Sequence, residues 1–302
     1  MVSPSPRLAA ARVDAAPLAF LALVGGALAM GISPIFVRFA EVGPFASASW
    51  RAALALPALW LWSAWEGRTS KRTEPDAAAR IAVVLAGILF AGDLTFWHLA
   101  IMNTSVANAT FLATLAPVWV VLGSGLFLGE SVARTVVIGL ALCMAGAAAL
   151  IGGTWSANPA QLDGDFYGLV TSIFFGAYFL AVRRARRGYG SGRTIFLSTA
   201  VTALVLLAEA LIIEDRMLPL TMAGVGALVA LALVSQAGGQ GLLAFALGHL
   251  PAAFSSLVIF LEAIAAAAFG WLFLGEGIAA AQALGAAAIF AGIFIARPRR
   301  PA

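Results

Sequence analysis

Long apolar stretches alternate with short polar connections along the whole chain. Each stretch has about twenty residues, the length that an α-helix needs to cross the hydrocarbon core of a bilayer. The hydrophobicity is unbroken, whereas a membrane β-strand would alternate in polarity over about ten residues. The pattern predicts an all-α integral membrane protein with ten spanning helices, at 17–38, 45–65, 81–102, 105–127, 134–152, 164–183, 194–213, 222–247, 252–274 and 278–296.

A repeated sequence divides the chain into two halves. Leu126-Phe-Leu-Gly-Glu130 recurs letter for letter as Leu272-Phe-Leu-Gly-Glu276, and each copy closes an apolar run. The segment Gly31 to Arg38 lies opposite Gly176 to Arg183 at an offset of 145, and both segments are small-residue span interiors that end in arginine. We therefore predict one membrane domain made of two five-helix halves, residues 1–152 and 153–302. Because five is odd, the second half is inverted relative to the first, as in many transporters.

The positions of Lys and Arg predict the orientation. With both termini in the cytoplasm, fifteen of the 18 cations fall on the cytoplasmic side. The exceptions are Arg38, Arg51 and Arg216. Cytoplasmic loops are enriched in Lys and Arg, so this bias supports an even number of spans.

Composition excludes several classes of protein. Hydrophobic residues make up 62% of the chain and charged residues 11%, whereas soluble domains are about 45–50% apolar and about a quarter charged. The chain has no Walker lysine motif, no His-Glu-x-x-His, no Gly-x-Ser-x-Gly and no Cys/His metal cluster. We expect no enzyme activity, no cofactor, no metal and no nucleic-acid partner. Cys143 stands alone in an apolar run, where we expect it to pack.

Polar residues inside the predicted spans are candidates for function, because a charge at the bilayer centre costs about 2.5–3.5 kcal/mol on insertion scales. Asp93 and Trp97 are one helical turn apart and His98 follows them, so the three side chains lie near one another. Gln236 and Gln240 share a helix face among glycines, and Glu262 lies deep in the ninth span. The candidate substrate-binding residues are His98, Trp97, Trp119, Asp93, Asn108, Tyr178, Gln236, Gln240, Glu262 and Ser33.

Each candidate has a structural alternative. His98 could be a hydrogen-bonded link between helices, and the two glutamines could hold helices together. Asp93 and Glu262 could each bind substrate, carry a proton or pair with a neighbouring polar group. Pro34 and Pro117 interrupt helix hydrogen bonding, so they are either hinges or bends accommodated by packing.

Residues at span ends suggest other roles. Six tryptophans lie near or beyond span ends, where indoles favour the membrane–water interface: Trp50, Trp60, Trp62, Trp65, Trp155 and Trp271. Glu130 and Glu276 each follow a glycine at a span end. We expect them to cap or orient the next helix.

The sequence resembles the EamA-type families of the drug/metabolite transporter superfamily. The resemblance rests on the two Leu-Phe-Leu-Gly-Glu copies, on Leu115-Ala-Pro-Val-Trp119 and on Gly31-Ile-Ser-Pro-Ile-Phe-Val-Arg38, and it covers essentially the whole chain. Within the superfamily, Trp97-His98 and Trp119 look most like bacterial exporters of aromatic amino acids. The second half departs from the pattern, since Ala263 occupies the place of Pro117.

The resemblance implies a secondary transporter in the bacterial inner membrane, acting as a monomer. It implies export of amino acids, preferentially aromatic or bulky neutral ones, by alternating access. A carboxyl group would pair with the substrate ammonium, while His98 and the amides would bind its carboxylate. Two alternatives stay open: a polyspecific drug or metabolite exporter, and an intramembrane lipid-modifying enzyme or lipid scaffold. The last would need a polar cluster near the membrane surface, and the polar candidates lie deep instead.

Overall fold

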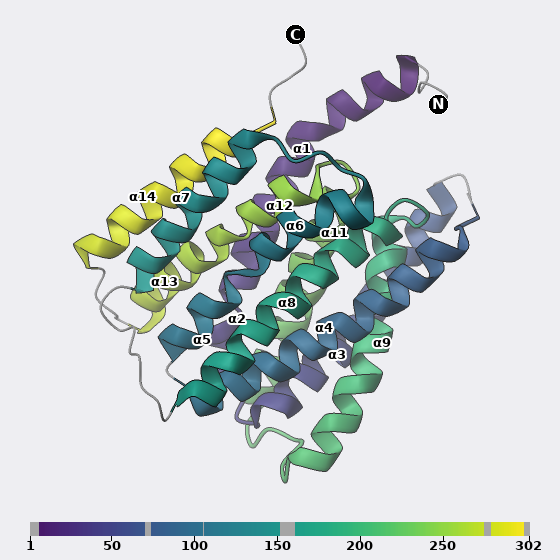
Figure 1. Cartoon of the computed structure of the whole chain (residues 1–302). Helices are drawn as coiled ribbons and strands as arrows, with labels where there is room; N and C mark the ends of the chain where they lie inside the picture. The colour runs from purple at the N-terminus through teal and green to yellow at the C-terminus, as the bar shows by residue number, and fades with distance from the viewer. Residues whose placement is uncertain (1–5, 70–73, 105, 152–160, 275–278, 299–302) are drawn as a thin grey trace.

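A computed structural model describes residues 6–69, 74–104, 106–151, 161–274 and 279–298 as a bundle of helices (Figure 1). Every regular element within those ranges is helical. The helices are α1 (Pro6–Gly31), α2 (Ser33–Phe39), α3 (Pro44–Thr69), α4 (Ala77–Asn103), α5 (Val106–Ala113), α6 (Ala116–Leu128), α7 (Arg134–Ile151), α8 (Leu162–Ala185), α9 (Ser191–Ile213), α10 (Met222–Ala230), the π-helix η3 (Leu231–Gln240), α11 (Gly241–Leu247), α12 (Ala252–Val258), α13 (Phe260–Leu274) and α14 (Ala280–Ala296).

Seven helical stretches are long and apolar enough to cross a membrane: Ala16–Phe39, Ala77–Asn103, Phe111–Leu128, Leu162–Ala185, Ser191–Ile213, Met222–Leu247 and Ala252–Phe273. Two apolar helices are shorter, Arg134–Leu150 and Ala280–Ala296. Helix α3 has 26 residues, but its charged and polar positions keep it out of this set. Large apolar side chains cover the outside of the bundle, Leu126 and Ile212 among them at 79% and 84% exposure. Such a surface suits lipid and not water.

Three of the long apolar stretches are broken. The first bends at Ile32 between α1 and α2, and another is interrupted at Thr114 and Leu115 between α5 and α6. Pro34 and Pro117 each lie in the first turn of the segment that follows the break, where a missing N–H costs nothing. The third break, at Ile259 between α12 and α13, has no proline.

A π-helix forms the middle of the stretch from Met222 to Leu247. It covers Leu231 to Gln240 and carries Gln236 and Gln240. Hydrogen bonds in a π-helix run to the fifth residue, which widens the turn, and such segments occur frequently at functional sites. Gly239 faces Gly26 of α1, where a Cβ would come 3.3 Å from the Gly26 carbonyl oxygen. The missing side chains therefore let α1 approach the π-helix closely.

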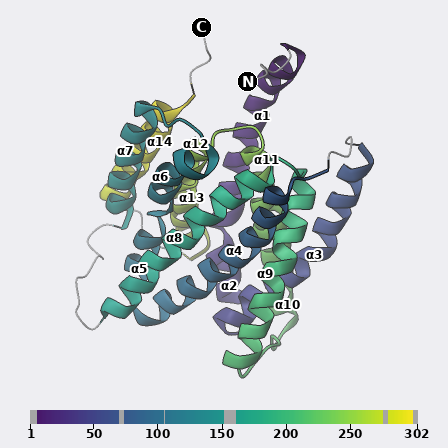
Figure 2. The same cartoon turned by 45° about the vertical axis from the view of Figure 1, so that its right-hand side comes forward.

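Helices from the two halves of the chain pack directly on each other. Helix α3 packs along α9, α4 along α8, and α7 along α14, while α1 packs against η3, α11 and α13. Figures 1 and 2 both show α7 and α14 side by side at one edge of the bundle. The halves therefore form one interlocked unit rather than two separate bodies.

The contact between α7 and α14 is reciprocal. A Cβ on Gly146 would lie 2.5 Å from the carbonyl oxygen of Gly285, and a Cβ on Gly285 would lie 2.5 Å from that of Gly146. Gly139 and Gly292 show the same relation. Cys143 is fully buried between these pairs, so the prediction that it packs is confirmed.

Carboxylates at helix ends also act across the two halves. Glu66, near the end of α3, accepts from the backbone N–H of Ser191 at the start of α9, at 2.7 Å. Glu214, just after α9, accepts from the N–H of Phe45 at the start of α3, at 2.9 Å. A carboxylate is favourable at a helix N-terminus because the first N–H groups lack partners there.

The bundle begins and ends on the same side. Helix α1 starts, and α14 finishes, at the upper end of the views in Figures 1 and 2. The connection between α9 and α10 lies at the opposite end.

Candidate substrate site

A buried arginine lies among the polar residues of the bundle. Arg51 belongs to α3, about 10 Å along the helix from its start at Pro44, and it is 9% exposed. Its Nε donates to Oε1 of Gln236 at 2.9 Å, and its guanidinium lies 5.7 Å from the ring centre of Phe90. Gln236 is held in turn, because its Nε2 donates to Thr199 at 3.1 Å. The guanidinium is thus fixed from its edge and from its face.

Carboxyl groups from two other helices act on this arginine. Asp93 of α4 and Glu262 of α13 both interact electrostatically with Arg51. Asp93 is buried, and Glu262 is partly buried. The backbone of Glu262 packs against Gly31, where a Cβ would lie 2.8 Å from the Glu262 carbonyl oxygen. Acidic and basic side chains therefore lie near one another inside an apolar bundle.

A small cavity adjoins Arg51. Its volume is about 10 Å³, close to what one water molecule needs. The lining residues are Ser33, Val37, Ser47, Ala48, Arg51, Leu94, Trp97, His98 and Leu231. An amino acid does not fit a space of this size, so the side chains around it would have to move for one to bind.

His98 lies in the wall of this cavity with an unsatisfied nitrogen. The side chain is 3% exposed and packs against Phe45 and Trp97, with ring centres 5.5 and 5.1 Å away. The Leu94 carbonyl, one turn earlier, approaches the imidazole. Nδ1 nevertheless has no partner in hydrogen-bonding geometry among the described residues. A buried polar atom without a partner costs about 1–3 kcal/mol, so this atom is a candidate for binding a ligand.

The second glutamine of the π-helix joins three helices. Gln240 accepts from the hydroxyl of Tyr178 on α8 at 2.9 Å and donates to Sδ of Met30 on α1 at 3.2 Å. Tyr178 is fully buried and tilts against Phe90, with ring centres 4.8 Å apart. Since Phe90 also contacts Arg51, this network continues the polar cluster into the bundle interior.

The remaining candidate residues lie in different places. Trp119 packs against Gly176 of α8, and its indole N–H donates to Ser172 at 2.8 Å. It therefore lies in the α6–α8 contact and not in the wall of the small cavity. Ser33 lines that cavity from α2. The side chain of Asn108 lies outside the described residues.

Sequence reasoning missed Arg51, which it counted as one of three cations on the external side. The signal was present, because Arg51 lies well inside the apolar run 45–65. It also missed the third helix break, at Ile259, since no proline marks it.

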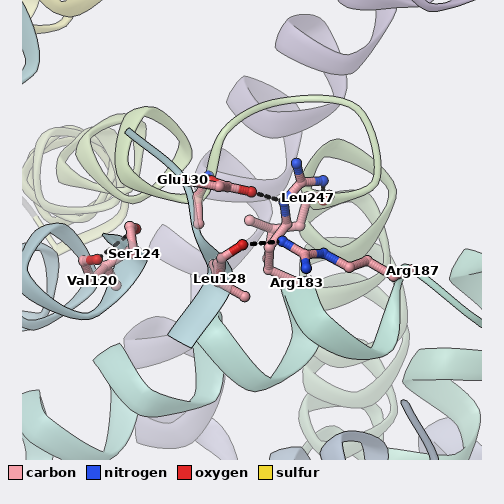
Figure 3. Close-up of polar contacts among 8 residues, drawn as sticks. Val120, Ser124, Leu128, Glu130, Arg183, Arg187 and Leu247 are labelled. Carbon is pink, nitrogen blue, oxygen red and sulfur yellow. Dashed lines mark hydrogen bonds and ion pairs between the residues drawn. The ribbon is translucent and has the colours of Figure 1, made fainter. Parts of the chain in front are cut away.

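Glu130 and a group of arginines form a set of polar contacts near the end of α6 (Figure 3). Arg183 Nε donates to Glu130 at 2.7 Å, and Arg183 also bonds the carbonyl oxygen of Leu247. Arg187 bonds the carbonyl oxygen of Leu128 at the end of α6. Burial lowers the pKa of the neighbouring Arg186 to about 10, which leaves it protonated at neutral pH.

The expectation for Glu130 needs one correction. Its second oxygen accepts from the backbone N–H of Ala252 at 3.0 Å, so it caps α12 in the other half and not the next helix, α7. The reason is that α6, which Gly129 ends in a left-handed conformation with φ of 64°, packs against α12. Glu276 lies outside the described residues.

These features define a multi-pass membrane protein whose helices surround a buried polar site. The model of the EamA-like transporter family matches the sequence twice, at residues 17–152 and 162–297. Together the two matches cover most of the chain. The chain belongs to the EamA-like transporter family, and its two halves are two copies of the family's repeat.

Two comparisons add detail. The chain is 28% identical over 198 residues to the pseudopaline exporter CntI from two strains of Pseudomonas aeruginosa. That match covers 64% of this chain and 66% of the relative's length. A protein of known crystal structure shares the fold with a TM-score of 0.79 at 18% identity, over 93% of this chain and 96% of its own.

Proposed function

We propose that this protein is a secondary transporter that exports amino acids, preferentially aromatic or bulky neutral ones, by alternating access. The observation that carries the proposal is a buried arginine, Arg51, which is held by Gln236 and Phe90 and lines the same cavity as Trp97 and His98, with the buried Asp93 one turn before Trp97 on α4. An amino acid carries a carboxylate, an ammonium and a side chain, and this site offers a partner for each. Indole and imidazole rings suit an aromatic substrate.

The proposal includes ten spans in two inverted halves. Reciprocal contacts support it: Gly139 meets Gly292 while Gly146 meets Gly285, and Glu66 and Glu214 each cap the other half's helix. Breaks at Leu115 and Ile259 fall at matching places in the two repeats. Discontinuous helices in corresponding positions are typical of transporters whose halves rock about a central site.

We place the protein in the bacterial inner membrane with both termini in the cytoplasm. The bias of Lys and Arg supports this orientation, and so does the common end of the bundle at which α1 begins and α14 finishes (Figure 1). The single chain contains both halves of the site, so one copy suffices for transport.

Tryptophan flux into proteoliposomes of the purified protein tests the function. We expect saturable flux that falls about tenfold in His98→Ala, as the loss of about 1.4 kcal/mol of binding free energy gives. The matched control is His249→Ala, because His249 contacts Phe245 at the end of α11 and lies outside the cavity lining. Flux no higher than that of empty vesicles, from folded protein, would remove amino acids from consideration.

A second candidate is a polyspecific drug or metabolite exporter. The likeness to a pseudopaline exporter favours it, because export of a metabolite does not require an aromatic side chain. Under this reading, diverse organic cations inhibit flux, and the carboxylate of the substrate is dispensable. Cationic dyes added to the tryptophan flux assay distinguish the two functions.

A further inference from the structure

We propose that Arg51 binds the carboxylate of the transported molecule and so restricts transport to zwitterions, excluding the corresponding amines. This inference rests on the proposed function and adds the residue that selects the class of substrate. An arginine deep in a membrane span is energetically costly, so its presence calls for a function that compensates the cost.

The surroundings of Arg51 prepare it for a carboxylate. Gln236 takes the Nε–H and Phe90 covers the guanidinium face, so few of the side chain's rotamers remain. A guanidinium held in this way binds carboxylate oxygens with high geometric specificity. Arg51 also lines the cavity, which means that a molecule entering this space meets it directly.

His98 gives a second, independent indication that a ligand binds in this cavity. It is almost fully buried, its Nδ1 has no partner among the described residues, and it shares the cavity wall with Arg51. In addition, Ser33 and Ser47 line the same cavity. A carboxylate between Arg51 and His98 would have several donors from three helices.

The balance of charged groups points to a zwitterion. The acidic side chains of Asp93 and Glu262 lie within electrostatic range of Arg51, so groups that can take an ammonium are available near the guanidinium. A zwitterion brings one group of each sign, so its carboxylate can pair with Arg51 while its ammonium pairs with Asp93 or Glu262. An amine without a carboxylate would leave Arg51 without an anionic ligand, and a carboxylate without an ammonium would compete with both acids.

The experiment measures binding of radiolabelled tryptophan to purified protein and its displacement by tryptamine and indole-3-propionate. Tryptamine lacks the carboxylate and indole-3-propionate lacks the ammonium. We expect each to be at least about a hundredfold weaker than tryptophan, since a site built to hydrogen-bond a group rejects the analogue that lacks it. Equal binding of tryptophan and tryptamine by the native protein would overturn the inference, and this comparison needs no variant.

Variants then test whether Arg51 is the residue that selects tryptophan over tryptamine. Arg51→Gln should lose the preference for tryptophan over tryptamine, and Arg51→Lys should lose about tenfold in affinity because it keeps the charge without the fixed fork. Arg216→Gln, at an exposed arginine, is the matched control and should bind as the native protein does. A preference that persists in folded Arg51→Gln contradicts the role of Arg51 but leaves amino-acid export standing. Absence of tryptophan binding to native protein overturns both proposals.

Discussion

At the scale of residues, single side chains link helices that are far apart in the sequence. Gln236 joins α3 to α9 through Arg51 and Thr199, and Gln240 joins α1 to α8 through Met30 and Tyr178. A buried amide can serve two helices because it both donates and accepts. These residues thus combine a structural role with a place beside the proposed site.

Asp76 gives a pH-dependent prediction. The Arg184 guanidinium, which donates to Asp76 at 2.7 Å, and the Ala79 N–H hold the pKa of this carboxyl below its ordinary value. Because folding lowers the pKa of Asp76, these contacts stabilise the folded protein at pH values above the ordinary pKa of 3.8. This stabilisation is lost as the pH falls through the lower pKa of the folded state. Asp76→Asn should therefore lower the melting temperature in detergent at pH 7, with the difference shrinking toward pH 3. A difference independent of pH would contradict this.

Glu130 gives a second prediction at this scale. Glutamine keeps one acceptor oxygen, so Glu130→Gln removes the negative charge and leaves either Arg183 or the backbone N–H of Ala252 facing an NH2 donor instead of an oxygen. We expect Glu130→Gln to cost about 1.5–3 kcal/mol, the range for hydrogen bonds to charged groups. The measurement is the midpoint of SDS-induced unfolding. Glu74→Gln, at an exposed carboxylate, is the control and should change little, while Arg183→Gln combined with Glu130→Gln should cost less than the sum.

At the scale of elements, two features shape the bundle: close contacts between helices and breaks within helices. Glycines let α7 approach α14 and let α1 approach the π-helix, as expected where helices associate in lipid through small residues. The breaks at Ile32, Leu115 and Ile259 leave backbone groups outside regular helix. Such backbone is tolerated at membrane depth only where protein buries it or water reaches it.

The α7–α14 contact can be tested with one methyl group. In Gly285→Ala the new Cβ would lie 2.5 Å from the carbonyl oxygen of Gly146, so the helices must separate. We expect a loss of about 1–3 kcal/mol, the usual cost of overpacking. Gly226→Ala in α10 has no atom within 4 Å of the added Cβ and should be neutral or slightly stabilising. Equal midpoints of SDS-induced unfolding for the two variants would show that the close contact is dispensable.

At the scale of the whole molecule, the two repeats of the family share one interior. Each half packs on the other through its helices, through reciprocal glycines and through carboxylates at helix ends. The cluster at Glu130 links α6, α8 and α12 at one end, and the small cavity beside Arg51 lies about 10 Å along α3 from its start at Pro44. A change of access would require the contacts at one end to separate while those at the other form.

The orientation of the chain can be tested by chemical labelling. Cys143 is fully buried, so a maleimide should react only with a cysteine introduced at the surface. In Asp215→Cys, between α9 and α10, we expect labelling of intact cells by a membrane-impermeant maleimide. In Glu74→Cys, before α4, labelling should require permeabilised cells. The reverse pattern would invert the predicted orientation, and labelling of both in intact cells would contradict a single orientation.

The sequence predicted a large part of this picture, for identifiable reasons. Long apolar runs predict the helices, and Pro34 and Pro117 indicate two of the helix breaks. Both features can be predicted because each depends only on residues that are close together in the sequence. Trp60, Trp65 and Trp271 are 56%, 64% and 55% exposed, as expected of interfacial indoles. Trp62 differs, since it packs on Gly192 and Gly241, and Trp155 lies outside the described residues.

The sequence alone determined that the chain is a helical membrane protein written as two repeats, because hydrophobic length and repetition can be read along the chain. Only the tertiary structure decided which polar groups meet. Arg51 of α3 lies beside Gln236 of the π-helix, 185 positions away, and the partner of Glu130 is the start of α12 rather than α7. Such pairings depend on how helices from opposite halves pack, and that packing is set by contacts across the fold that no local pattern contains.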